Sequence, residues 1–119
     1  MLHWKNLKVW EKSNCLTKKI YELTSKFPKQ EQFGVISQIR RAAYSIPVNI
    51  VEGKSRKNTK EFIQFLNISN ASLEEVRYFI FLSKDLKYIN EEDYLMLENK
   101  CEEISKMLNG LINSLKEKL

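Results

Sequence analysis

Apolar residues recur at steps of three and four along almost the whole chain, the spacing that keeps them on one face of an α-helix. Four such stripes are present, separated by short polar or proline-containing segments. Only two prolines and three glycines occur in 119 residues, so few positions favour breaking a helix. Four helices with short connections pack most simply as an up-down-up-down bundle. We therefore predict an all-α fold in which residues 1–119 form a single domain, an antiparallel four-helix bundle.

Each predicted helix is defined by an inward stripe of apolar and small residues. The four stripes are Val9, Ser13, Leu16, Ile20, Leu23 and Phe27; Ile36, Ile39, Ala43, Ile46 and Ile50; Phe62, Leu66, Ser69, Leu73, Val76, Ile80 and Ser83; and Tyr94, Leu97, Cys101, Ile104, Leu108, Leu111 and Leu115. Pro28 should end the first helix, because the residue before a proline is pushed out of helical conformation. Gly53 should supply the C-terminal cap of the second helix, and Asn58 and Asn90 should cap the starts of the third and fourth.

Pro47 falls inside the second predicted helix. Proline lacks a backbone N–H and clashes with the preceding turn, which costs about 3 kcal/mol in a helix interior. A kink that lets the helix bend around the bundle is the favoured interpretation. The alternatives are a re-aimed basic face or a backbone carbonyl that is freed for an interface.

Positive charge is concentrated between Gln38 and Lys60. This segment has Glu52 as its only acid, and its net charge of +5 equals the formal net charge of the whole chain. Its cations are Arg40, Arg41, Lys54, Arg56, Lys57 and Lys60. Contacts to phosphates supply most non-specific affinity for nucleic acids, so we predict that these six residues bind nucleic acid. A solvated helix end and loop would explain the same residues, because net charge does not identify a partner.

Apolar residues also lie outside the predicted stripes of the second and third helices. They are Val48, Val51, Ile63, Ile68, Phe81 and Leu82. Broad apolar coverage usually indicates a partner surface, here most simply another copy of the chain. The alternative is that these two helices are more deeply buried than the others within one bundle.

A polar line at heptad spacing runs along the second predicted helix, roughly opposite its apolar stripe. It comprises Gln38, Arg41, Ser45, Asn49, Glu52 and Arg56. Such residues can form a hydrogen-bonded network across a subunit boundary, or they can be a solvated face. We predict an oligomer interface made of Gln38, Arg41, Ser45, Asn49, Glu52, Ile63 and Phe81.

The sequence offers little for catalysis. His3 is the only histidine, so one chain can assemble neither a histidine-based nucleophilic arrangement nor a multi-histidine metal site. Cys15 and Cys101 lack metal-ligand spacing and are interpreted as buried or half-buried free thiols rather than a redox pair. We predict no catalytic residue, no metal and no cofactor; a nuclease built from scattered carboxylates is the remaining enzymatic alternative.

The chain has no apolar run long enough to cross a bilayer. Its first residues lack the apolar core of a signal peptide. We therefore expect a cytoplasmic protein with no membrane partner.

Several specific motifs resemble a known family. They are Leu7-x-Val9-Trp10, Phe27-Pro28, Gln38-Ile39-x-Arg41-Ala42 and Ser45-Ile46-Pro47-x-Asn49-Ile50-x-Glu52-Gly53. Together they resemble the four-helix-bundle proteins encoded in intervening sequences of bacterial 23S ribosomal RNA genes. The accessory proteins of diversity-generating retroelements, which bind a reverse transcriptase and RNA, share that shape. Val51 and Ala71 depart from the family pattern, which commonly has alanine and glycine there.

The resemblance implies a bundle that assembles into a ring, typically a pentamer, with no known enzymatic activity. Our first functional hypothesis is a non-catalytic ring that binds structured RNA, or other nucleic acid, by shape and phosphate. The competing hypothesis is a scaffold that binds a protein such as a reverse transcriptase and makes no nucleic-acid contact. The partners expected are thus other copies of the chain, RNA or DNA, and a polymerase-like protein.

Overall fold

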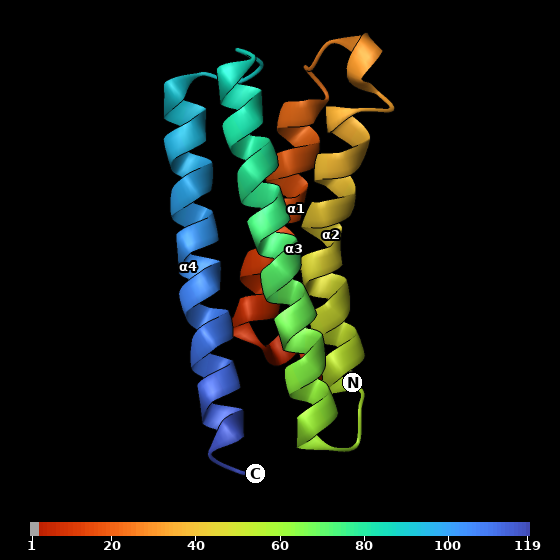
Figure 1. Cartoon of the computed structure of the whole chain (residues 1–119), viewed down its shortest axis with the longest axis vertical. Helices are drawn as coiled ribbons and strands as arrows, with labels where there is room; N and C mark the ends of the chain where they lie inside the picture. Colours follow the sequence, from red (N-terminus) through yellow and green to blue (C-terminus); the bar gives the residue numbers. More distant parts are fainter. Residues whose placement is uncertain (1–2) are drawn as a thin grey trace.

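Four long α-helices lie side by side in the computed structural model, which describes residues 3–119 (Figure 1). They are α1 (Lys8–Thr24), α2 (Val35–Lys54), α3 (Thr59–Asp85) and α4 (Glu91–Lys116), with short 3₁₀ segments η1 (His3–Asn6) and η2 (Lys29–Glu31). Successive helices run in opposite directions, and the bundle measures 46 × 23 × 22 Å. No strand occurs among the described residues. The predicted all-α four-helix bundle is therefore confirmed.

The predicted N-terminal caps of α3 and α4 are confirmed. Asn58 Oδ1 accepts the backbone N–H of Glu61 at 2.8 Å, and the amide of Asn58 donates to the Glu61 carboxylate at 3.2 Å. Asn90 Oδ1 accepts the N–H of Asp93 at 2.7 Å. Each side chain thus satisfies one of the backbone donors that a helix start leaves unpaired.

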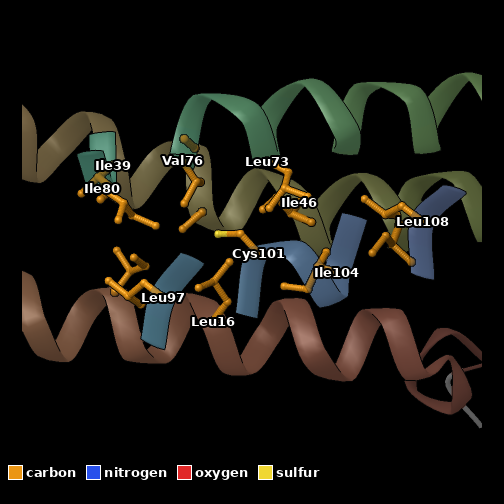
Figure 2. Close-up of a cluster of buried hydrophobic side chains, with 14 of the residues drawn as sticks. Leu16, Ile39, Ile46, Leu73, Val76, Ile80, Leu97, Cys101, Ile104 and Leu108 are labelled. Carbon is orange, nitrogen blue, oxygen red and sulfur yellow. The ribbon is translucent and has the colours of Figure 1, made fainter. Parts of the chain in front are cut away.

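The core is built from the predicted stripes, and Figure 2 shows part of it. Near the end of α4 the core position differs from the prediction: Ile112 is buried, whereas Leu111 is only partly buried, as is Tyr94 at the start of the helix. A strict seven-residue spacing drifts by about 20° per heptad on a straight helix, so the inward position moves by one residue near the end of α4. The first helix also ends earlier than predicted, at Thr24, although Phe27 still reaches the core.

Small residues let α2 and α3 approach closely. A Cβ on Gly53 would lie 2.8 Å from Phe65 Cβ and 2.9 Å from a ring carbon of Phe62. Further along, Ser69 Oγ donates to the backbone carbonyl of Ile46 at 2.9 Å. The predicted role of Gly53 as a C-terminal cap is therefore wrong. It lies within α2 without positive φ, and its lack of a side chain serves helix packing instead.

The helix α2 continues through Pro47, which is buried. Because Pro47 has no N–H, the carbonyl of Ala43, one turn earlier, loses its helical partner. The hydroxyl of Thr17 on α1 lies 3.1 Å from that carbonyl oxygen and 2.9 Å from the carbonyl oxygen of Ser13, so its proton is shared between them. The carbonyl that the proline frees is thus satisfied inside the bundle and is not left for an interface.

We expect Thr17→Val to lower the free energy of unfolding by about 1–2 kcal/mol, because it leaves a part-buried carbonyl without a donor. In a Pro47→Ala background the restored N–H can bond to Ala43, so the same substitution should cost markedly less. Urea denaturation of the four proteins of this double-mutant cycle measures the coupling. Thr17→Ser keeps the hydroxyl and serves as the control. An equal cost of Thr17→Val in both backgrounds would contradict the assignment.

Candidate nucleic-acid interface

Four of the six predicted phosphate-binding residues meet at the α2–α3 turn, at one end of the bundle. Backbone hydrogen bonds from Ser55 and Arg56 back to α2, and the Asn58 cap of α3, hold this turn in a short defined path. The predicted cations Lys54, Arg56, Lys57 and Lys60 are all exposed here. This part of the predicted site is therefore brought together by the fold.

The four cations of the turn differ in what they contact. Arg56 pairs with Glu52 at 3.2 Å and lies 4.7 Å from the ring centroid of Phe65. The Lys54 ammonium lies 5.8 Å from the ring centroid of Phe62. Lys57 and Lys60 form no ion pair within residues 3–119. These two lysines are consequently the groups best able to exchange water for a phosphate.

Arg40 belongs to a different part of the molecule. It precedes Lys54 by 14 residues on α2, which places the two roughly 20 Å apart at 1.5 Å per residue. Its Nε donates to Thr24 Oγ1 at 2.8 Å and one terminal nitrogen donates to the backbone carbonyl of Tyr21 at 3.3 Å. The guanidinium also lies 4.5 Å from the centroid of the Tyr21 ring. Arg40 therefore fastens α2 to the C-terminal end of α1 and is not gathered with the turn.

A shallow hollow of about 290 Å³ lies on the outer face shared by α2 and α3. It is lined by Gln38, Arg41, Ala42, Tyr44, Ser45 and Glu75. Arg41 is exposed and, among residues 3–119, forms no ion pair; the same holds for Glu75 across the hollow. Arg41 is thus separate from the α2–α3 turn and available to a partner at this face.

Some residues of the predicted polar line form hydrogen bonds within the chain itself. The Asn49 amide donates to the backbone carbonyl and to the hydroxyl of Ser45, at 2.8 and 3.1 Å. The hydroxyl of Ser72 on α3 donates to Ser45 Oγ at 3.0 Å. Glu52 pairs with Arg56, as described above. The middle of the polar line therefore joins α2 to α3, whatever further contacts the line makes.

The apolar residues predicted to stand off the core divide into three groups. Ile63 is 7% exposed and belongs to the core, so its assignment to an outward-facing surface is wrong. It is buried because α3 packs against both α2 and α4, which widens its inward arc. Leu82 and Val51 are partly buried. Phe81, Ile68 and Val48 are 45%, 47% and 48% exposed and remain open to a partner.

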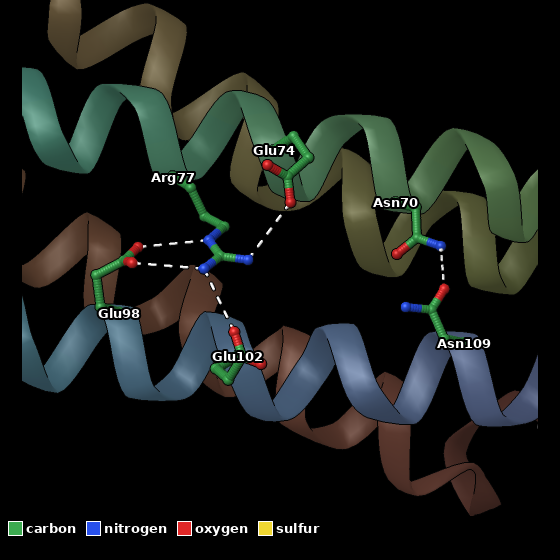
Figure 3. A network of polar contacts seen from close by, with 6 residues as sticks. All are labelled: Asn70, Glu74, Arg77, Glu98, Glu102 and Asn109. Atoms are coloured by element: carbon green, nitrogen blue, oxygen red, sulfur yellow. Dashed lines mark hydrogen bonds and ion pairs between the residues drawn. The ribbon is translucent and has the colours of Figure 1, made fainter.

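An ion-pair cluster between α3 and α4 was not predicted from the sequence (Figure 3). Arg77 contacts Glu98 at 3.5 Å, Glu102 at 3.4 Å and Glu74 at 3.4 Å. Although burial acts to lower it, the pKa of Arg77 is raised, because Glu98 accepts a hydrogen bond and adds its negative charge. Helical spacings of three and four between these charges were the available signal. The cluster fixes how α3 and α4 pair.

The described residues hold no group of three or more histidine, cysteine or acidic side chains that is suited to a metal ion. Cys101 is a buried free thiol, and burial, with a smaller contribution from Glu98, raises its pKa to about 12. Cys15 is a free but exposed thiol, so the prediction that it is buried or half-buried is wrong: it lies beside the apolar stripe of α1 and not within it. The side chain of His3 lies outside the described residues. In residues 3–119 no helix combines the length and apolar character needed to span a membrane.

We expect Arg40→Met to lower the free energy of unfolding by about 1–2 kcal/mol, because the substitution removes the donor to the buried Thr24 hydroxyl oxygen and one of the donors to the Tyr21 carbonyl. Lys26→Met, at an exposed position on the same end of the bundle, should change it by less than about 0.5 kcal/mol. Thermal or urea denaturation makes the comparison. Equal effects of the two substitutions would show that Arg40 does not fasten α1 to α2.

Comparison with known proteins identifies the family. The family model described as 23S rRNA-intervening sequence protein matches residues 5–110. The crystal structure of a protein of unknown function from the S23 ribosomal protein family of Bacteroides thetaiotaomicron VPI-5482 is 31% identical to this chain, with a TM-score of 0.78. The similarity covers 87% of this chain and 97% of that one. No curated protein matches the chain. With nearly the whole bundle matched, the chain belongs to the family of 23S rRNA-intervening sequence proteins.

Proposed function

We propose that this protein is a non-catalytic, ring-forming four-helix bundle that binds structured RNA through the cations of the α2–α3 turn. The observation that carries the proposal is the exposed position of Lys57 and Lys60 on a short, capped turn, where neither forms an ion pair with a residue of the described chain. The family's association with intervening sequences of 23S rRNA agrees with an RNA partner.

Recognition by phosphate and shape suits the groups at this turn better than stacking on bases does. The two nearest aromatic rings, Phe62 and Phe65, lie beneath Lys54 and Arg56 and are occupied by those cations. Proteins that bind single strands without sequence preference present free aromatic faces to the bases. A surface of cations alone contacts the backbone, so we expect binding to structured RNA with little sequence preference and a steep dependence on salt.

The outer α2–α3 face is the surface we propose for assembly. It presents Arg41 and Glu75, without ion pairs, around one hollow. The exposed side chains of Val48 and Ile68 lie on the same two helices. Charged and apolar groups together suit one side of the head-to-tail contact that a ring requires, in which this face meets a different surface of the next copy. In a ring, the weak phosphate contacts of each copy would reinforce one another.

Exposed apolar side chains toward the opposite end of the bundle favour the alternative of a protein scaffold. Phe33 is 90% exposed, and Tyr78 and Leu95 are 57% and 53% exposed. A polymerase-like partner such as a reverse transcriptase would bury these groups. Recovery of one such partner from nuclease-treated lysate, with no RNA bound by the purified protein, would favour the scaffold over RNA binding.

The RNA-binding proposal predicts that the wild-type protein binds a fluorescein-labelled RNA hairpin saturably, with an affinity that falls steeply between about 50 and 200 mM salt. Lys57→Glu together with Lys60→Glu should weaken binding by about tenfold or more at one salt concentration, because two phosphate contacts become repulsive. Fluorescence anisotropy measures both.

The matched control is Lys26→Glu together with Lys29→Glu, which changes the net charge equally at the opposite end. It should weaken binding by less than about threefold, through long-range charge alone. Equal losses in the two double variants would assign the binding to net charge and overturn the role of the turn.

The assembly proposal predicts a mass in solution that is a multiple of 14.1 kDa, about five-fold for a pentamer. If this face forms one side of the interface, Arg41→Glu and Glu75→Arg should each shift the mass toward one copy, because each places the opposite charge against the groups that it meets on the neighbour. Size-exclusion chromatography with light scattering measures the mass. Unchanged assembly in both single variants would remove this face from the interface.

A further inference from the structure

The bundle end that carries the α2–α3 turn also receives the last turn of α4, far away in the sequence. The pairing of α3 with α4 fixes this placement, since Asn70 donates to Asn109 at 3.0 Å and the two helices run in opposite directions (Figure 3). Seven residues before Asn70 and seven after Asn109 bring the beginning of α3 opposite Lys116. Figure 1 shows the α2–α3 turn and the C-terminal end of α4 at the same end of the bundle. Lys116 and the adjacent Lys118 are both exposed.

Charge is distributed unequally between the two ends of the bundle. Residues 52–61 and 113–119 contribute six cations and three acids: Lys54, Arg56, Lys57, Lys60, Lys116 and Lys118, with Glu52, Glu61 and Glu117. The net charge of these residues is therefore +3: Glu52 is paired with Arg56, and Glu61 keeps its charge while it accepts from the neutral Asn58 amide. The opposite end, residues 25–34 and 84–93, has four lysines and five carboxylates. An anionic polymer is therefore attracted to one end of the bundle only.

Two more lysines come from the beginning of the chain. Lys5 lies in η1 and Lys8 is the first residue of α1, and η1 packs against both α1 and α2. Since α1 runs away from this end of the bundle, both lysines lie on the same half as the α2–α3 turn. They add two positive charges to that half of the bundle, and no acidic residue lies between them in the sequence.

We infer that the phosphate surface of this protein spans the whole end, from the α2–α3 turn to Lys116 and Lys118, and takes a double-helical segment of RNA lying across the end. The inference rests on the proposed function, because it specifies how the RNA lies on the site. A surface along the side of α2 is disfavoured, because Arg40 is fastened to α1. The end is 22–23 Å wide, and a duplex crossing that width carries roughly a dozen phosphates at one charge per 1.7 Å of axis.

Lys116 and Lys118 lie beyond residue 110, where the match to the family model stops. Their effect on binding can be measured separately from that of the α2–α3 turn, because the two groups of lysines can be substituted independently. Lysine suits such a surface, because its ammonium is a point charge on a flexible stem that needs no particular base or fixed geometry.

The test compares three double variants. The α4 variant carries Lys116→Glu and Lys118→Glu, the turn variant carries Lys57→Glu and Lys60→Glu, and the control carries Lys26→Glu and Lys29→Glu. Each full-length protein is titrated against one labelled RNA duplex of about 20 base pairs at several salt concentrations. The α4 variant should bind about tenfold more weakly than wild type, and the slope of log K against log salt should become shallower by roughly 0.9 for each phosphate that the variant no longer neutralises. The control should bind less than threefold more weakly than wild type.

The outcomes separate the two proposals. If the turn variant loses binding while the α4 variant matches the control, the spanning surface is wrong and the proposed RNA function stands. If the wild-type protein does not bind the duplex at low salt, both are wrong. Lys116→Gln with Lys118→Gln checks the result without placing acids in the last turn of a helix, where they are unfavourable.

Chemical modification gives a second readout that needs no substitution. Acetylation of lysines in the presence and absence of the RNA duplex, followed by mass spectrometry, should show protection of Lys57, Lys60, Lys116 and Lys118. Lys26 and Lys29 should react equally in both samples. Protection of the turn lysines without protection of Lys116 and Lys118 would overturn the spanning surface.

Discussion

The close contact between α2 and α3 is the constraint on which the rest of the structure depends. Gly53 leaves room for Phe62 and Phe65, and the Ser69 hydroxyl reaches a backbone carbonyl of α2. Helices that approach this closely can be joined by a short turn. Such a turn is too short to bend back and bury its charged side chains against the bundle. The exposure of Lys57 and Lys60 is thus a consequence of packing and not only of their polarity.

Much of the fold was predictable because burial in a bundle is governed by apolar spacing and by local caps. The stripes and the asparagine caps depend on residues within a few positions of one another, so a single sequence contains the needed information. The failures at Gly53 and Ile63 have a different origin. Each depends on which neighbouring helix lies opposite, and that is decided by packing between segments. The hydroxyl that donates to the Ala43 carbonyl belongs to Thr17 on another helix, so this contact could not be predicted from the sequence either.

The sequence was enough to predict that cations form the candidate site, but not which of these cations lie together in the fold. Arg40 and Lys57 are indistinguishable as cations in the same basic segment, yet Arg40 is fixed by contacts to Thr24 and Tyr21, whereas Lys57 has no ion pair within residues 3–119. Conversely, Lys116 is over fifty residues from that segment, and only the antiparallel pairing of α3 and α4 brings it to the same end. Charge counting along a sequence detects the excess of positive charge, whereas the helix order determines where that excess is gathered.

The uneven charge of the bundle also bears on the proposed ring. Copies in a closed ring are related by rotation alone, so every basic end takes the same position relative to the ring axis. Copies that place these ends near one another repel, and the repulsion is screened only beyond about 8 Å at physiological salt. An RNA duplex that contacts several ends would relieve the repulsion. By linkage, RNA would then favour assembly to the same extent that assembly tightens RNA binding. Under the proposed function, RNA binding and ring formation are therefore one coupled equilibrium, and the basic end is the element that joins them.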